Sequence, residues 1–161
     1  PHVYACGVDV VGPSSLETLM ASIPPYWEAQ RVMLYRAVGD PRTEAGAALL
    51  RERSPLHRAD RIARPLLIGQ GANDPRVLQS EADQMVAALH ANAVPVTYVL
   101  YPDEGHGFVR PANRLSFNAV VEAFLARHLG GRFQPVSPGE FDGTTMEVRE
   151  DSGGVATMPV A

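Results

Sequence analysis

The sequence is poor in cysteine, in long apolar runs and in positive charge. A single cysteine excludes an internal disulfide framework and a Cys-rich zinc site, and Cys6 is interpreted as a small buried hydrophobic residue. No apolar stretch approaches the roughly 20 residues that span a bilayer, so no membrane partner is expected. The 14 basic and 18 acidic residues give a net charge of −4, which argues against nucleic acid as a partner.

The histidines lack the spacing of a metal site. No two of the five stand at the separations that zinc ligands adopt. The acidic pair Asp103-Glu104, which lies next to His106, is interpreted as a polar turn. We therefore expect neither a metal nor another cofactor.

The length and the apolar content indicate one domain or a part of a larger one. The 161 residues are 45% apolar, which is enough for a substantial core. No signal peptide is recognisable, which favours a cytoplasmic location. The chain does not begin with methionine, however, and a leader that had been removed would leave the same pattern.

Two short apolar segments each end in a glycine-containing loop that carries one titratable side chain. The first, 66–68, is followed by Gly-Gln-Gly and then by Asp74. The second, 96–101, is followed by a turn in which two glycines flank His106. Glycines let the backbone turn sharply and leave the imidazole accessible to another group. Both segments are predicted to be strands, because they are short, apolar and rich in β-branched or aromatic residues.

The residues between these strands, 78–93, predict a helix. A strand, a helix and a second strand in this order give adjacent parallel strands with a right-handed crossover. Both loops then open at the same edge of the sheet, where open α/β sheets place their sites. We therefore expect Asp74 to lie close to His106 and to orient it, as in a nucleophilic triad. The apolar face of the helix is predicted to contain Leu78, Ala82, Met85, Val86 and Leu89, with Ser80, Glu81, Asp83, Gln84 and His90 facing outward.

The rest of the chain continues the alternation of strands and helices. Residues 3–11 predict a central parallel strand buried on both faces, which suggests that further strands and helices precede it in a longer protein. Ser14 and Glu17 fit a capping box, in which Ser14 caps the following helix. Further helices are predicted over 14–22, 26–38, 43–53 and from Pro111 or Asn113 to residue 129. Residues 132–161, rich in Gly, Pro, Ser, Thr and Glu, predict an extended tail that is mobile from about residue 150.

The nucleophile of a triad is missing from the sequence. In an α/β-hydrolase the serine stands in a G-x-S-x-G turn and precedes the aspartate and the histidine. The nearest segment, Gly12-Pro13-Ser14-Ser15-Leu16, lacks the second glycine. We expect the nucleophilic serine to lie before Pro1.

Several segments resemble the carboxyl-terminal catalytic domain of the prolyl oligopeptidase family of serine peptidases, in the branch of the acylaminoacyl peptidases and dipeptidyl aminopeptidases. The resemblance extends to about Gly131. The resembling segments are A-C-G-V-D-V-V-G-P-S-S-L (5–16), S-I-P-P-Y-W (22–27), R-S-P-L (53–56), P-L-L-I-G-Q-G-A-N-D-P-R-V (65–77) and Y-P-D-E-G-H-G-F (101–108).

This resemblance implies the carboxyl-terminal portion of an α/β-hydrolase fold, a parallel sheet with flanking helices, over residues 1–131, followed by the tail 132–161. It implies hydrolysis of short peptides, with Asp74 and His106 as the catalytic aspartate and histidine. The family's G-x-S-x-G-G turn, oxyanion-hole tyrosine and amino-terminal β-propeller are absent from this sequence. The amino-terminal remainder of the same protein is therefore an expected partner. Residues expected to line the substrate pocket are Leu16, Leu19, Tyr26, Trp27 and Val77.

Three functions are compatible with these observations. The first is a serine peptidase acting on a peptide substrate, to which this chain contributes the aspartate and the histidine while being inactive alone. The second is an esterase-type acyl hydrolase on the same fold, because a triad does not fix the substrate. The third is a catalytically inactive fragment that docks with the missing amino-terminal portion. A homo-oligomer is compatible with all three.

Overall fold

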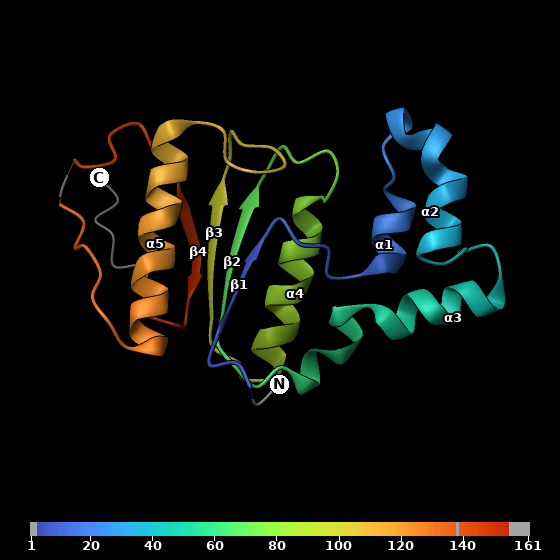
Figure 1. Ribbon diagram of the computed structural model, residues 1–161, viewed down its shortest axis with the longest axis horizontal. Helices are drawn as coiled ribbons and strands as arrows, with labels where there is room; N and C mark the ends of the chain where they lie inside the picture. The colour runs from blue at the N-terminus through green and yellow to red at the C-terminus, as the bar shows by residue number, and fades with distance from the viewer. Residues whose placement is uncertain (1–2, 138, 155–161) are drawn as a thin grey trace.

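The computed structural model describes residues 3–137 and 139–154, and a four-stranded sheet lies at its centre (Figure 1). The strand order is β1-β2-β3-β4. The strands are β1 (Gly7–Val10), β2 (Leu66–Gly71), β3 (Val96–Tyr101) and β4 (Glu147–Asp151). The first three are mutually parallel, with Leu66 opposite Gly7 and Val96, whereas β4 runs antiparallel to β3.

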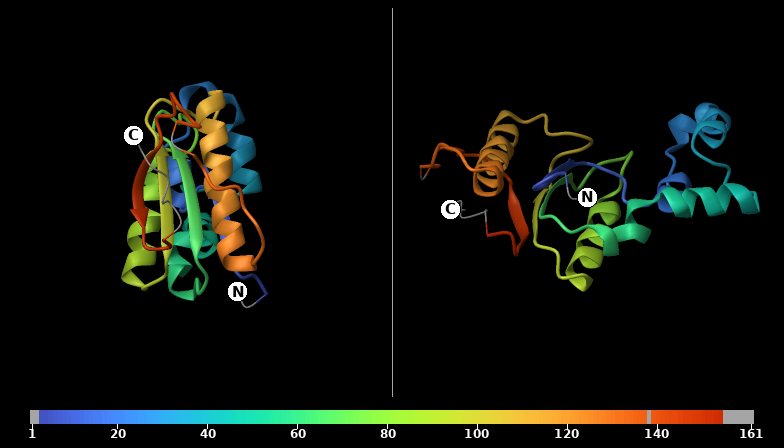
Figure 2. Two further views of the ribbon diagram at one scale, coloured as in Figure 1. Left: turned by 90° about the vertical axis from the view of Figure 1, so that its left-hand side faces the viewer. Right: turned by 60° about the horizontal axis from the view of Figure 1, so that its bottom comes forward.

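Two long helices cover the opposite faces of this sheet. Helix α4 (Gln79–Ala91) connects β2 to β3 and packs on one face, and α5 (Pro111–Leu129) follows β3 and packs on the other (Figures 1 and 2). Parallel strands joined by helices require both faces to be covered. The predicted α/β architecture with a parallel sheet and flanking helices is confirmed.

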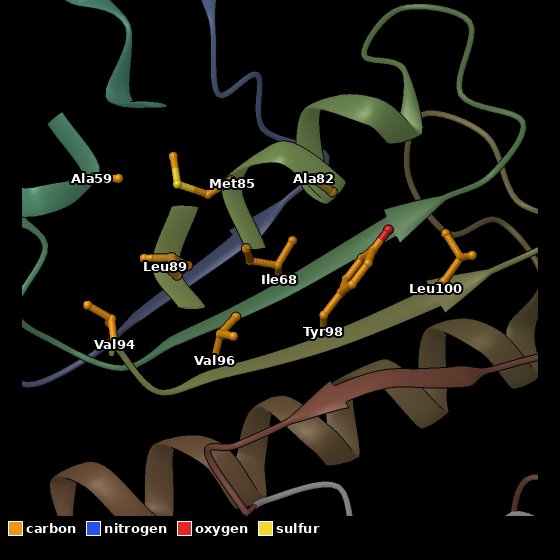
Figure 3. Close-up of a cluster of buried hydrophobic side chains, with 9 residues drawn as sticks. All are labelled: Ala59, Ile68, Ala82, Met85, Leu89, Val94, Val96, Tyr98 and Leu100. Carbon is orange, nitrogen blue, oxygen red and sulfur yellow. The ribbon is translucent and has the colours of Figure 1, made fainter. Parts of the chain in front are cut away.

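The side chains of β3 alternate between the two helices, as the two-residue period of a strand requires. Val96, Tyr98 and Leu100 belong to the cluster under α4, which also contains Ile68 of β2 (Figure 3). Val99 and Tyr101 point to the opposite cluster, under α5. The α4 side chains of the first cluster are Ala82, Met85 and Leu89, and the α5 side chains of the second are Phe117, Val120 and Phe124.

A largely helical excursion joins β1 to β2 and extends beyond α4, away from α5 (Figures 1 and 2). It consists of α1 (Leu16–Ala21), η1 (Pro25–Gln30), α2 (Arg31–Ala37), α3 (Glu44–Arg53) and η2 (Pro55–Arg61), where η denotes a 3₁₀ helix. Thr43 caps α3 by accepting a hydrogen bond from the Gly46 N–H at 3.0 Å, at the predicted start of that helix. The helix predicted over 26–38 is divided into η1 and α2.

Strand β1 is shorter and more exposed than predicted. It spans Gly7–Val10 instead of 3–11, and among the described residues only β2 pairs with it. Val8 and Val10 are 37% and 42% exposed, so the prediction of a strand buried on both faces is wrong for this chain. The apolar composition of the strand is consistent with a neighbour on its open side, and no described residue supplies one.

The tail contains a strand that was not predicted from the sequence. Residues 147–151 form β4, and Thr97 lies opposite Asp151 across the β3–β4 ladder. Strand β4 is a charged edge strand, with Val148 as its only aliphatic residue, and such strands lack the apolar run by which buried strands are recognised. Residues 155–161, which fall in the part predicted to be mobile, lie outside the described residues. Within the described ranges, no helix is both long and apolar enough to cross a membrane.

Candidate active site

The loops that follow β2 and β3 bring Asp74 and His106 together. The Nδ1 atom of His106 lies 2.8 Å from Oδ2 of Asp74, a hydrogen-bond distance. The two residues stand 32 positions apart in the chain. They meet because β2 and β3 are adjacent and parallel, so both loops leave the same end of the sheet (Figure 1).

The Asp74 carboxylate is buried and fully engaged. Its side chain has no exposed area, and its Oδ1 atom accepts hydrogen bonds from the backbone N–H groups of Arg76 (2.8 Å) and Val77 (3.0 Å). These two bonds fix the carboxylate and leave Oδ2 for the imidazole. A buried carboxylate needs such donors, because burial of an unpaired charge is costly.

The imidazole of His106 lies between this buried carboxylate and solvent. Its side chain is 32% exposed. With Asp74 as acceptor, Nδ1 carries the proton and Nε2 has a free lone pair. The pair thus has the arrangement of a general base that is oriented by a carboxylate.

The two loops are also joined by hydrogen bonds of their own. The Ala72 N–H donates to the Tyr101 carbonyl at 3.0 Å, and the Asn73 N–H donates to the Glu104 carbonyl at 2.9 Å. The side-chain amide of Asn73 donates to the Pro102 carbonyl at 2.8 Å. The distance between Asp74 and His106 is therefore set by backbone contacts as well as by their own hydrogen bond.

Glycine is required at positions 71 and 107 of the site for two different steric reasons. A Cβ atom on Gly71 would lie 2.3 Å from the carbonyl oxygen of Gly105 and 2.6 Å from that of Glu104, so only glycine permits this approach of the loops. Gly107 has φ = 103°, a conformation that is strained for any other residue. The glycine that follows His106 thus allows the turn that presents the imidazole.

Gln70 is hydrogen-bonded to the backbone at both ends of the Asp74 loop. It is fully buried in β2, and its Nε2 atom donates to the carbonyls of Gly71 and Val77, both at 3.0 Å. Reasoning from the sequence did not single out this residue. A glutamine between two glycines at the end of an apolar strand was the available signal.

The residues expected to line the substrate pocket lie at different places. Trp27 is half-buried beside the Asp74 loop, with the Arg76 guanidinium carbon 5.9 Å from its ring centroid, and Tyr26 packs edge-on against it. Val77 is buried and bonds to Asp74 through its backbone N–H. Leu16 and Leu19 lie half-buried in α1, where the Leu16 N–H donates to Ser54 Oγ at 2.8 Å.

The prediction that Glu81 faces outward from α4 is wrong. It is buried, and its Oε2 atom accepts hydrogen bonds from the N–H groups of Ser14 (3.0 Å) and Ser15 (2.9 Å). Position 81 adjoins Ala82 and precedes Met85 by four residues, so helix geometry places it on the buried side. Leu78, which was predicted on the apolar face, is instead the N-cap of α4 and is 42% exposed. The prediction that Ser14 caps the next helix is also wrong, because Ser14 bonds to Glu81 and Ser15 is the cap of α1.

Glu104 was interpreted as part of a polar turn, and it is buried instead. Its carboxylate accepts three hydrogen bonds, from the N–H groups of Val109 and Arg110 and from the side-chain amide of Asn113, each at 2.9 Å. The neighbouring Asp103 is exposed, and hydrogen bonds from Thr145 and Asn113 together with the charge of Arg110 lower the pKa of its carboxyl. Glu104 thus holds the loop together from the interior, whereas Asp103 lies at the surface.

Two other histidines contact a carboxylate, in different surroundings. His57 Nε2 lies 2.5 Å from Glu17 Oε2, and His90 Nε2 lies 3.1 Å from Glu150 Oε2. The Glu17 and Glu150 side chains are 38% and 28% exposed, whereas that of Asp74 is wholly buried. Among the described residues, no group of three or more His, Cys, Asp or Glu side chains could hold a metal ion.

Comparison with known proteins places the chain in a family. Residues 1–132 match the prolyl oligopeptidase family. The chain is 57% identical over 161 residues to dipeptidyl aminopeptidase BIII of Pseudoxanthomonas mexicana, covering 100% of this chain and 23% of that protein. It is 50% identical over 147 residues to dipeptidyl peptidase family member 6 of Caenorhabditis elegans, covering 91% of this chain and 20% of that protein.

Solved structures agree with this placement. A puromycin-hydrolyzing peptidase of Mycobacterium tuberculosis is 28% identical, with a TM-score of 0.75 over 85% of this chain and 20% of that one. The chain thus spans about a fifth of the length of the relatives that it matches. Since the family match covers residues 1–132 of 161, the chain belongs to the prolyl oligopeptidase family.

Proposed function

We propose that this chain supplies the aspartate and the histidine of a Ser-Asp-His triad in a longer serine peptidase that hydrolyses short peptides. The observation that carries the proposal is the 2.8 Å contact between the buried Asp74 carboxylate and the partly exposed His106 ring. The names of the relatives, dipeptidyl aminopeptidase and dipeptidyl peptidase, support a substrate of this class. The longer protein, which also carries the serine, is called the parent protein.

In the proposed mechanism, His106 moves one proton in each half of the reaction. Its Nε2 atom takes the proton of the serine hydroxyl as the oxygen attacks the peptide carbonyl, and it then gives that proton to the leaving amine. In the second half, His106 takes a proton from water as the water oxygen attacks the acyl-enzyme, and it returns that proton to the serine oxygen as the acid product leaves. Asp74 stays ionised throughout, keeps the proton of the neutral ring on Nδ1 and stabilises the imidazolium that forms.

The serines of the β1–α1 turn are poor candidates for the nucleophile. Ser14 and Ser15 are both buried, and the Ser14 hydroxyl donates to the Glu81 carbonyl at 2.7 Å while Ser15 Oγ accepts from the Thr18 N–H. A nucleophile must instead have an exposed oxygen within reach of Nε2. These engagements support a serine that lies upstream of this chain.

The excursion between β1 and β2 is the proposed substrate side of the site. Trp27 lies against Arg76 in the loop that holds Asp74, so a substrate side chain beside this ring would be near the aspartate–histidine pair. Tyr26, which is 57% exposed, extends the aromatic surface. Leu16, Leu19 and Val77 complete the proposed pocket.

The test is made on the parent protein with His106→Ala and Asp74→Asn. We expect each to lower kcat by about 10⁴-fold, because the first removes the base and the second favours the wrong tautomer. Labelling by a fluorophosphonate probe is expected to slow in parallel. His90→Ala, which changes a surface histidine whose Nε2 lies 3.1 Å from Glu150, is the matched control and is expected to keep full turnover. Turnover of His106→Ala close to that of the native protein would refute the proposal.

The same parent protein distinguishes peptide from ester hydrolysis. A triad alone serves both reactions, because the fold does not fix the substrate. We expect dipeptidyl p-nitroanilides to be cleaved with a higher kcat/KM than simple p-nitrophenyl esters of matched acyl groups, after correction for the uncatalysed rates. The reverse order would favour an esterase.

A further inference from the structure

The loop that presents His106 is closed by one buried carboxylate. Glu104 lies two residues before the histidine and is 3% exposed. Its Oε2 atom accepts the N–H of Val109 at 2.9 Å, and Oε1 accepts the N–H of Arg110 at 2.9 Å. The side chain on one side of the loop thus holds the backbone on the other side. His106 lies between these two attachment points.

Asn113 connects this carboxylate to a rigid helix. It is fully buried in the first turn of α5, and its Nδ2 atom donates to Glu104 Oε1 at 2.9 Å and to Asp103 Oδ1 at 3.0 Å. Helix α5 is itself packed on the sheet through Phe117 and Phe124. A displacement of Glu104 therefore requires either the loss of these bonds or a movement of α5.

The carboxyl-terminal segment occupies the remaining polar atom of Asn113. Asn113 Oδ1 accepts the Thr145 N–H at 2.9 Å and the Thr144 hydroxyl at 3.1 Å. The Thr145 hydroxyl also donates to Asp103 Oδ1. Immediately after these residues, the chain enters β4 and pairs with β3. The segment is thus fixed at Asn113 and along β3.

We propose that Glu104 and Asn113 are positioning residues for His106, and that segment 144–151 braces the His106 loop through Asn113. The inference rests on the proposed function, because it assigns a role in the turnover of His106. It concerns a segment beyond residue 132, where the match to the prolyl oligopeptidase family ends. Glu104 and Asn113 touch no reacting atom, and they act by fixing the loop between residues 104 and 110.

The expected effect follows from the geometric demands of proton transfer. The Nε2 atom must lie within hydrogen-bond reach of the serine hydroxyl and then of the leaving amine. A displacement of about 1 Å can cost roughly 10²-fold in rate. Loss of a loop attachment should therefore lower kcat, whereas KM, which depends on the substrate side of the site, should change little.

The experiment compares Glu104→Gln and Asn113→Ala with the native parent protein. The glutamine keeps the shape of Glu104 but turns an amide donor towards one backbone N–H, and the alanine removes both bonds to the carboxylates. Active sites are counted by titration with a fluorophosphonate, and kcat and KM are measured for the dipeptidyl p-nitroanilide that the parent cleaves fastest. We expect kcat to fall by about 10- to 100-fold, with KM within about threefold of the native value.

Two threonine variants separate the brace from general stability. Thr144→Val removes the hydroxyl bond to Asn113 but leaves Glu104 and Asn113 in place, and it is expected to lower kcat by about three- to tenfold. Thr97→Val is the matched control. It removes the bond from the Thr97 hydroxyl to Asp151 Oδ1 (2.9 Å), which attaches the same segment at its other end, far along the strand from His106. We expect Thr97→Val to keep native kcat even if its melting temperature falls.

The outcomes are distinct from those of the triad test. If His106→Ala abolishes turnover but Glu104→Gln and Asn113→Ala retain native kcat per titrated site, the positioning role is wrong and the triad proposal stands. If Glu104→Gln and Asn113→Ala do not fold, Thr144→Val decides, and native kcat in that variant overturns the brace. Equal losses in Thr144→Val and Thr97→Val would show a general effect of stability and would also overturn it.

Discussion

Gly71 determines how closely the two loops of the site can approach each other. An added Cβ would lie 2.3 Å from the Gly105 carbonyl oxygen, and both partners are backbone, so the loops would have to separate. We expect Gly71→Ala to lower the free energy of unfolding by about 2 kcal/mol, as overpacking does, and to reduce turnover of the parent protein. Thermal unfolding and kcat of the parent are the measurements.

Gly105→Ala is the matched variant for this comparison, because a Cβ there would meet only the Asn73 carbonyl oxygen, at 3.8 Å. We expect it to lose less stability than Gly71→Ala. A melting temperature of Gly71→Ala equal to that of the native parent would show that the loops separate without cost, which contradicts a tight contact at Gly71.

Among single residues, Asp74 and His106 could be placed from the sequence, whereas the buried glutamates Glu81 and Glu104 could not. The proximity of Asp74 and His106 follows from strand order alone, because adjacent parallel strands open at the same end. Glu81 and Glu104 were placed outward because they are charged, and a charged residue is usually exposed. Backbone N–H groups satisfy both carboxylates, those of the distant β1–α1 turn for Glu81 and those of its own loop for Glu104, which composition and residue type do not reveal.

At the scale of elements, Glu81 joins α4 to the β1–α1 turn. Its Oε2 atom accepts from the N–H groups of Ser14 and Ser15, while the Ser14 hydroxyl donates to the Glu81 carbonyl. Glu81→Ala would remove the oxygen that accepts both N–H groups, and each unsatisfied buried donor costs about 1–3 kcal/mol. We therefore expect hydrogen exchange at the Ser14 and Ser15 amides of the parent protein to become at least roughly tenfold faster, since about 1.4 kcal/mol is a factor of ten.

Asp83→Asn tests whether this effect belongs to the buried carboxylate or to any charge on α4. Asp83 lies on the same helix, is exposed, and accepts the Tyr98 hydroxyl at 2.9 Å, a bond that asparagine can keep. We expect native exchange at Ser14 and Ser15 in this variant. Equal acceleration in the two variants would mean that Glu81 does not hold the turn.

Elements with strong periodicity were predicted well, and those that depend on a partner were not. Helix α4 and strand β3 occur where the apolar spacing placed them, because their own side chains form the core. Strand β4 was missed because its order comes from pairing with β3 and from the Asn113 bonds, and its own sequence is charged. Strand β1 was predicted too long because its apolar composition was taken to mean burial.

For the whole molecule, two regions of different character can be distinguished. The sheet with α4 and α5 forms one layered body, and the excursion 11–65 extends from it (Figure 2). The excursion is attached through Glu81 of α4, through Ala59 in the cluster under α4, and through the bond from the Val11 N–H to the Gly69 carbonyl of β2 at 2.9 Å. Because the proposed substrate residues lie mainly in this excursion, we expect changes in its attachment to alter KM, and changes in the His106 loop to alter kcat.

The open edge of the sheet governs how the 161-residue chain behaves when it is produced alone. Strand β1 pairs only with β2 among the described residues, and Val8 and Val10 are exposed beside its free backbone groups. Such an edge is a template for pairing with another chain. We expect the isolated chain to self-associate with increasing concentration, as measured by sedimentation velocity.

Val8→Lys is expected to suppress this association, because an edge lysine blocks strand pairing. The matched control is Val32→Lys, which changes a valine that is 60% exposed on α2, outside the sheet, and should associate as the native chain does. We propose that the upstream part of the parent protein covers this edge, and we expect Val8→Lys to weaken the contact between the two parts there. A native chain that stays monomeric at all concentrations and unfolds cooperatively would show that β1 needs no neighbour.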